Sequence, residues 1–438
     1  MNRDIALEAS LAVAVGLLIV TWAAFRSTGA PTAGAMRRGG MAVVLVYAVL
    51  AVPLLASSGL ALAGLAVLVV VIALAFAAGV VALRRSIGDD GRPRPETAGE
   101  RYARCAVSVG MTAVLLIAAA QTLSLLSRLD PRIIVLALTV VAGWLVVAQG
   151  LAATHRIGST AMWFMIVPVV ASLALGFYLG GPGVVADPIR LVDGVSAASA
   201  VGLAVVLVVL GWADGALRTS ALLGSWSRPR VLGGALGVVI LIVLGLLMLL
   251  GGAILVPSME FFTVPANLDM LPGLAGVVLA VLTVVFTALI AHTLSAAAGA
   301  VGVTSPADAP AADDDRQPDS ALALPAEWVL GAAIVAAALA LIDVGAPVLL
   351  LCTALVAAAV TGAQLAGPRI GAPGVTVGIA VAVVAAIVLA ATGQREIGWW
   401  TSLAIVVTAA AAFAAARLTA PAASDPETVS GQAPRTAG

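Results

Sequence analysis

The sequence predicts an all-α polytopic membrane protein with about thirteen transmembrane helices. Hydrophobic residues make up 62% of the 438 positions and charged residues only 10%, and the mean hydropathy of +1.14 lies well above that of soluble proteins. Apolar runs of about 20 residues, the length that crosses a bilayer core of roughly 30 Å, recur from end to end. Strands of a membrane barrel would alternate polar and apolar residues, and these runs do not.

The predicted spans are joined by short links that leave no room for a soluble domain. In chain order they lie at about 6–25, 41–57, 60–84, 105–127, 133–153, 161–180, 197–217, 231–256, 272–303, 328–344, 346–366, 373–393 and 398–418. Two polar segments, 304–326 and the tail 419–438, are expected to lie outside the membrane without fixed structure.

The placement of arginine predicts which way the spans run. All 22 basic residues are arginines, and cytoplasmic loops retain positive charge. Thirteen spans with the N-terminus outside place 17 of the 22 in inner segments. The C-terminus is therefore expected inside. The remaining five, in outer segments, are Arg3, Arg128, Arg132, Arg190 and Arg395.

Two spans, five apart in the chain, carry features that interrupt a membrane helix. The second contains Pro53 and ends at Ser57-Ser58-Gly59, and the seventh runs into the stretch Gly211 to Gly215. As one helix, residues 197–226 would reach about 45 Å, against roughly 30 Å of hydrocarbon, so this segment must tilt, break or turn. An offset of five spans inverts the second copy of a repeat, as in many transporters.

Four further segments share a pattern with a known family. Residues 94–126 contain AGERYARC before the fourth span, and 133–175 contain the glycine-marked turn GWLVVAQGLAATHRIG. The ninth span carries hydroxyls among small residues in AHTLSAAAG (within 286–303), and 367–388 begins with GPRIGAPGVTVG. In order, span number and loop length, the chain resembles a shortened and divergent member of the sodium:solute symporter family. That family has a LeuT-like fold of five-plus-five inverted repeats.

The resemblance implies five parts of the chain. They are a peripheral first helix with an inner loop (1–40), a first five-helix repeat (41–180), a second inverted repeat (181–366) with the loop 304–326, two peripheral helices (367–418) and a cytoplasmic tail (419–438).

The resemblance also implies a cation site between the second and ninth spans. Thr293 and Ser295 match the hydroxyls of the family's ninth helix, and Ala56 and Ser57 remain near the centre of its second. A membrane sodium site needs about five oxygens, which small hydroxyls and unwound carbonyls supply. Helix packing explains the same hydroxyls, because Thr and Ser often bond to their own backbone. His292 beside them is either a proton-coupling group or a histidine hydrogen-bonded to a neighbouring helix.

The seventh span supplies the candidate substrate residues Trp212, Asp214 and Gly215. If the Gly211 to Gly215 stretch unwinds, Trp212 closes one side of a cavity that Asp214 faces, since an intramembrane carboxylate is otherwise costly. The alternative is an ion pair between Asp214 and Arg218, four residues later on the same helix face. Gln121 is a further polar candidate, which hydrogen bonding between helices also explains.

The sequence argues against an enzyme. It contains two histidines, no lysine, and no glycine-rich phosphate motif or nucleophilic triad, so we expect neither an ATP-driven pump nor a hydrolase, and no cofactor apart from Na⁺ or H⁺ as coupling ion. Cys105 and Cys352 are too isolated for a metal site and are expected as small buried hydrophobes.

The expected function is cation-coupled symport of a small organic solute, with short carboxylates such as acetate as the favoured class, in the inner membrane of a bacterium. The second span lacks the family's phenylalanine, and the seventh lacks the proline of its Gly-Pro pair. A degenerate, non-transporting relative that acts as a membrane partner or sensor subunit is therefore an alternative. An amino-acid or nucleobase permease of the same fold is another. The expected partners are the solute, the ion and the bilayer, with no nucleic acid.

Overall fold

The computed structural model describes residues 3–25, 97–127, 129–150, 274–302, 324–342, 345–366, 372–393 and 398–419, with single residues and runs of two or three between 156 and 213. The predicted second, third and eighth spans, almost all of the 304–326 loop and nearly the whole tail lie outside these residues. The boundaries of the two repeats therefore stay predictions.

All regular structure among the described residues is helical. The helices are α1 (Arg3–Phe25), α4 (Ala98–Ser127), an unlabelled helix Pro131–Gly150, α10 (Leu274–Gly302), α11 (Ala326–Leu341), α12 (Ala346–Leu365), α13 (Ala372–Ala391) and α14 (Trp399–Leu418). Six of these described helices are long and apolar enough to cross a membrane, by length and composition; α1 and α11 contribute shorter apolar segments. The all-α class and the positions of these spans agree with the sequence prediction.

The start of α4 is the largest difference from the predicted spans. The hydrophobic run begins near residue 105, but the helix begins at Ala98. The backbone N–H of Glu100 donates to Thr97 Oγ1 (3.3 Å), and the backbone N–H of Thr97 donates to the Glu100 carboxylate (3.0 Å). This reciprocal capping box satisfies two donors at the helix start, and so extends α4 beyond its apolar part.

Replacing Thr97 by alanine is expected to fray the first turn of α4. Loss of an N-cap hydroxyl costs about 1 kcal/mol, which corresponds to roughly a fivefold rise in local opening. Hydrogen–deuterium exchange of the amides at 98–101 measures this opening. Thr97→Ser keeps the hydroxyl and should exchange like the parent protein. Equal exchange in Thr97→Ala and the parent would mean that the capping box does not hold the helix start.

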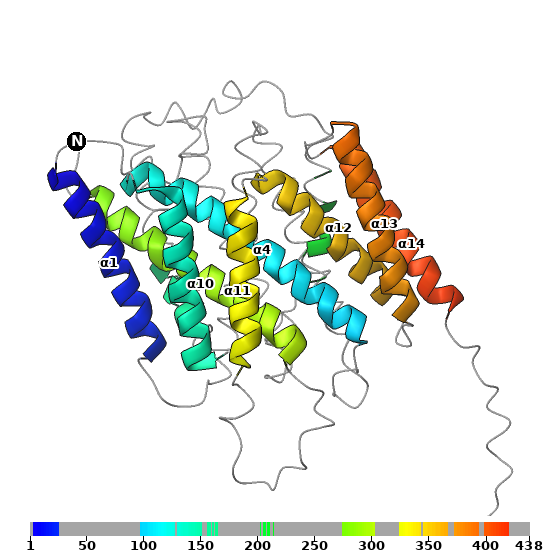
Figure 1. The fold of residues 1–438 in the computed structure, drawn as a ribbon, viewed down its shortest axis with the longest axis horizontal. Helices are drawn as coiled ribbons and strands as arrows, with labels where there is room; N and C mark the ends of the chain where they lie inside the picture. Colours follow the sequence, from blue (N-terminus) through cyan, green and yellow to red (C-terminus); the bar gives the residue numbers. More distant parts are fainter. Residues whose placement is uncertain are drawn as a thin grey trace, which may run out of the picture.

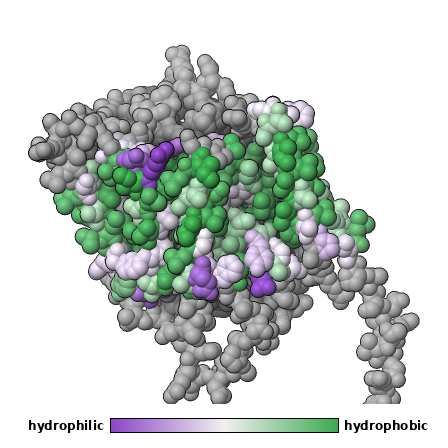
Figure 2. Space-filling model, in the orientation of Figure 1, coloured by the Kyte–Doolittle hydropathy of each residue, from purple (hydrophilic) through white to green (hydrophobic). Residues whose placement is uncertain are grey.

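The helices form a slab with a continuous apolar core. α1 lies at one edge and the α13–α14 pair at the other, with α10, α4, α11 and α12 between them (Figure 1). α10 packs against α1, α4 and α11, and α12 packs against α4, α13 and α14. Figure 2 shows a hydrophobic band over the described helices with more hydrophilic residues at its two margins, which is the surface of a membrane-spanning slab.

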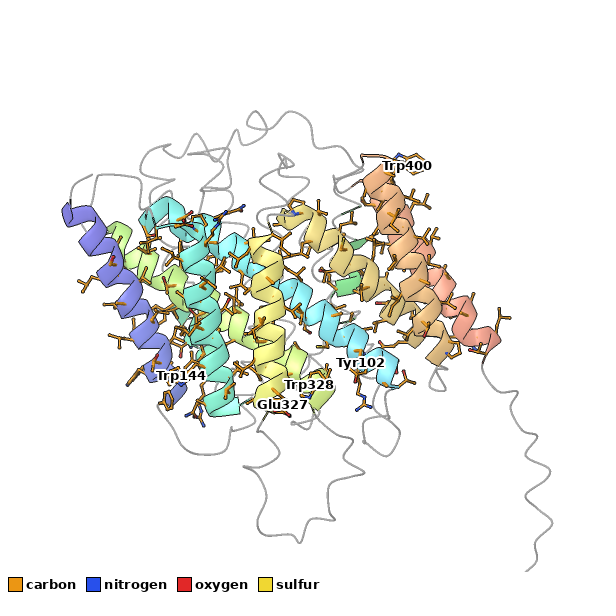
Figure 3. All side chains as sticks on the ribbon, viewed as in Figure 1. Tyr102, Trp144, Glu327, Trp328 and Trp400 are labelled. Carbon is orange, nitrogen blue, oxygen red and sulfur yellow. The ribbon has the colours of Figure 1, made fainter. Side chains whose placement is uncertain are left out.

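Exposed aromatic side chains lie at both ends of the slab. Tyr102, Trp144 and Trp328 lie near one end and Trp400 near the other (Figure 3). Trp and Tyr favour the two membrane–water interfaces, where the ring is in apolar surroundings and its polar atom reaches water. Because α4 and α11 begin at the same end and α14 begins at the opposite one, the arrangement fits the predicted alternation of the spans.

Candidate functional site

The hydroxyls predicted for the ninth span lie in the core of α10. Thr293 is 4% exposed, Ser295 1% and His292 3%, so all three are enclosed by protein. α10 itself is one of the most deeply buried of the described helices and packs along α4. Polar groups in this position are costly unless they bond to each other or to a ligand.

Thr293 pairs with Thr112, which lies halfway along α4. The two Oγ1 atoms are 2.7 Å apart, and Thr112 is fully buried. Thr112 Oγ1 also lies 2.8 Å from the carbonyl oxygen of Ser108, and Thr293 Oγ1 lies 3.2 Å and 3.1 Å from the carbonyl oxygens of Leu289 and Ile290.

The pair can be ordered in two ways because each hydroxyl has one proton. Either Thr293 donates to its own helix and Thr112 donates to Thr293, or Thr112 donates to Ser108 and Thr293 donates to Thr112. In both orders each hydroxyl oxygen keeps at least one lone pair, so two polar oxygens lie between the two helices. Neutral oxygen ligands away from water are able to bind a hard monovalent cation such as Na⁺.

Ser295 has a local partner. Its hydroxyl donates to the carbonyl oxygen of His292 at 2.7 Å, a bond within one turn of α10. Such a bond is what the alternative of helix packing predicts for this hydroxyl, which would then have no ligand role. The hydroxyl oxygen nevertheless keeps lone pairs for a further donor or a cation. His292 is buried beside it, and its role as a proton-coupling group stays a prediction.

The seventh span meets the start of α4 through Arg104. The Arg104 guanidinium Nη1 donates to the carbonyl oxygen of Ala213 at 3.2 Å, and the arginine is only 3% exposed. Ala213 is helical and fully buried, so at this residue the stretch Gly211 to Gly215, for which unwinding is one of the two alternatives, is not unwound. A second arginine makes a similar bond: Arg156 Nη1 donates to the carbonyl oxygen of Ala24 (3.3 Å) in the last turn of α1.

Several predicted site residues are not placed beside the Thr112–Thr293 pair. Ala56, Ser57, Trp212, Asp214 and Gly215 lie outside the described residues. Gln121 has an exposed side chain, nine residues beyond Thr112 on α4, which is about 13 Å along the helix axis.

The expectation for Cys352 was wrong. This cysteine is exposed on α12, while Cys105 is half-buried. A weakly polar side chain gains little from burial when its surroundings are lipid, because lipid is as apolar as the core. Among the described ranges, no group of three or more His, Cys, Asp or Glu residues could hold a metal ion.

Thr112 and Arg104 are not among the residues predicted from the sequence for this site. Both belong to a series with a spacing of four, Glu100, Arg104, Ser108 and Thr112, inside an otherwise apolar helix. That spacing keeps successive polar side chains close to one helix face and was the available signal. Their partners, 109 and 181 residues away, cannot be found from local pattern.

Comparisons with known proteins identify the fold and no family. No family model and no curated protein matches the chain. Among solved structures, 38 chains match, one of them in a structure described as the substrate-bound outward-open state of a Na⁺-coupled sialic acid symporter that reveals a novel Na⁺ site. That match has a TM-score of 0.61 and 12% sequence identity and covers 96% of this chain and 97% of the other. The chain is therefore a multi-pass, all-α membrane protein with the helical fold of a sodium-coupled symporter.

Proposed function

We propose that the chain is a cation-coupled secondary transporter that moves a small organic solute through a bacterial inner membrane by alternating access. The observation that carries this proposal is the buried Thr112–Thr293 hydroxyl pair, which lies halfway along α4, in a chain of which 96% is covered by the match to a Na⁺-coupled symporter. Helix packing alone does not require polar oxygens from two helices at this depth, since small apolar residues pack equally closely.

The proposed coupling ion is Na⁺, bound by hydroxyl and carbonyl oxygens around Thr293 and Ser295. No carboxylate or histidine cluster among the described residues offers the charge that a divalent ion prefers. Ala56 and Ser57 of the second span are the proposed ligands on the opposite side. H⁺ through His292 is the alternative ion, and it would make transport depend on pH and not on Na⁺.

The proposed solute is a short carboxylate, bound near Trp212, Asp214 and Gly215, with Gln121 as a further candidate. Sialic acid, the named substrate of the similar symporter, also carries a carboxylate. The solute class is tested separately from the ion, because an amino-acid or nucleobase permease of the same fold would bind the same cation and reject acetate.

The test uses purified protein with Na⁺ and acetate as probes. Na⁺ is expected to raise the melting temperature relative to K⁺, because a ligand that binds only the folded state stabilises it by about 2.7 kcal/mol at one hundred times its Kd. In proteoliposomes, an inward Na⁺ gradient is expected to drive uptake of labelled acetate. Thr293→Ala/Ser295→Ala should abolish both responses.

Thr287→Ala is the matched control. Thr287 is a fully buried hydroxyl on the same helix, and it donates to the carbonyl oxygen of Thr283 at 2.7 Å. This variant should keep the Na⁺ response. A parent protein that responds to Na⁺ but not to acetate would contradict only the solute class. A parent that responds to neither ion nor solute would favour the degenerate, non-transporting relative, for which the altered second and seventh spans already argue.

A further inference from the structure

One face of α4 carries a buried polar stripe, defined as Glu100, Arg104, Ser108 and Thr112. Each side chain is at most 3% exposed. Four residues turn a helix by about 400°, so the stripe winds by roughly 40° at each step. This winding explains why Arg104 reaches Ala213 of the seventh span while Thr112 reaches Thr293 of α10.

The polar stripe connects the helix start with the hydroxyl pair. From Glu100 to Thr112 it rises about 18 Å, which is more than half of a hydrocarbon core of roughly 30 Å. Beyond Thr112 the same spacing meets Leu116, a fully buried apolar residue. The stripe therefore runs from one membrane surface to mid-helix and ends there.

Helix capping and packing account for only part of this stripe. The Glu100 carboxylate belongs to the capping box with Thr97. A buried arginine and a buried serine further along an apolar helix are not needed for capping, and ionisable residues inside membranes mark ion or substrate pathways by default. Through Arg104 and Thr112, the polar stripe contacts two different elements, the seventh span at Ala213 and α10 at Thr293.

We propose that the polar stripe lines the ion's path between the Thr112–Thr293 pair and the membrane surface where α4 begins, and that the Arg104–Ala213 hydrogen bond closes this path. The proposal rests on the proposed function, since it gives the route of the coupling ion. The species that moves along this path is a monovalent cation that keeps part of its hydration shell. Arginine placement predicts that this surface is the cytoplasmic one.

Arg104 closes the path by both size and charge. Its guanidinium is hydrogen-bonded to the Ala213 carbonyl across the stripe, so a cation that leaves Thr112 meets a bulky, positively charged side chain. Movement of the seventh span away from α4 would break that bond.

The test measures water access to Ser108 with an impermeant thiol reagent. The chain has two cysteines, so Cys105→Ala/Cys352→Ala gives a cysteine-free background for the full-length protein. Ser108→Cys reports on the stripe. Val107→Cys is its control, because Val107 is fully buried at the same depth on another face. Ala98→Cys, at an exposed position at the helix start, identifies the labelled side in vesicles of either orientation.

Ser108→Cys is expected to react at least tenfold faster when Arg104→Gln is added, and only from the side that labels Ala98→Cys. Val107→Cys should stay unreactive in both backgrounds. Equal rates for Ser108→Cys and Val107→Cys in the Arg104→Gln protein would overturn the proposal, as would access from the opposite side. Arg104→Lys keeps the positive charge and a donor with nearly the reach of arginine, whereas glutamine is neutral and shorter, so the lysine variant is expected to keep the path closed.

A second measurement needs no change at Arg104, in case Arg104→Gln does not fold. In the parent background the path opens during each cycle, so prolonged labelling should modify Ser108→Cys and leave Val107→Cys intact. A protein that responds to Na⁺ while Ser108→Cys stays inert keeps the proposed function and loses this path. Reactive Ser108→Cys in a protein without any Na⁺ response would show that water reaches the stripe, but it would contradict both the proposed Na⁺ coupling and the role of the stripe as the path of that ion.

Discussion

Among glycine-to-alanine changes in the described helices, Gly362→Ala is expected to lower the stability of the fold most. Gly362 lies in α12 against the backbone of α14, where a Cβ would lie 2.7 Å from the carbonyl carbon and 2.9 Å from the Cα of Ala409. Backbone cannot rotate away as a side chain does, so the helices must separate. Overpacking of this kind costs about 1–3 kcal/mol, and we expect the upper end. Thermal unfolding in detergent should show a fall of roughly 5 °C.

Gly331→Ala is the matched control because it makes the same chemical change in open space. Gly331 lies in α11, and a Cβ there would meet nothing within 4 Å. Alanine is a better helix former than glycine by up to about 1 kcal/mol, so this variant should be as stable as the parent or more stable. If Gly362→Ala and Gly331→Ala unfold at the same temperature, the close approach of α12 and α14 is not as the structure has it.

The same kind of contact joins α13 to its neighbours. A Cβ at Gly378 would lie 2.7 Å from that of Ala412 in α14 and 2.8 Å from that of Ala359 in α12. Lipid gives helices no hydrophobic reason to associate, so close backbone approach through small residues supplies much of the attraction. The three helices therefore form one tightly packed unit, with the α13–α14 pair at the edge of the slab and α12 on its inner side.

The sequence predicts where these helices lie but not which faces meet. A span such as α12 is recognised from twenty apolar residues, and its predicted range of 346–366 agrees closely with Ala346–Leu365. The sequence does not show which face of each helix contacts its neighbours, because a membrane helix is apolar on its lipid side as well as on its buried side. Glycine and alanine are abundant throughout this chain, so composition does not single out Gly362.

The candidate site was predictable to a similar extent. Thr293 was identified through the resemblance of its helix to a known family, and the structure places it in the core. Its partner Thr112 requires knowledge of which helix lies beside α10, a long-range relation that no local pattern carries. The polar spacing of α4 shows that its buried face is unusual, but only the fold reveals that this face meets both the seventh span and α10.

Thr293→Val is expected to have the largest effect on transport among the conservative changes proposed for this protein. Valine keeps the shape of threonine and removes the oxygen, so loss of one cation ligand should raise the Na⁺ concentration for half-maximal acetate uptake about tenfold, which corresponds to roughly 1.4 kcal/mol. Thr112→Val removes a hydroxyl that acts through Thr293 and should raise it about threefold, roughly 0.65 kcal/mol. Thr293→Ser restores the oxygen and should restore Na⁺ dependence.

The double variant separates a ligand role from a packing role. A hydrogen bond between membrane helices contributes about 0.6 kcal/mol to stability on average, so each single variant and the double variant should unfold at similar temperatures. If the pair binds Na⁺, the effects of Thr112→Val and Thr293→Val on Na⁺ dependence should be less than additive, since both act on one oxygen cluster. Valine variants that lower the melting temperature and leave Na⁺ dependence unchanged would make the pair a packing contact. Thr287→Val, on the same helix without a described hydroxyl partner on α4, should change neither property by more than the error of measurement.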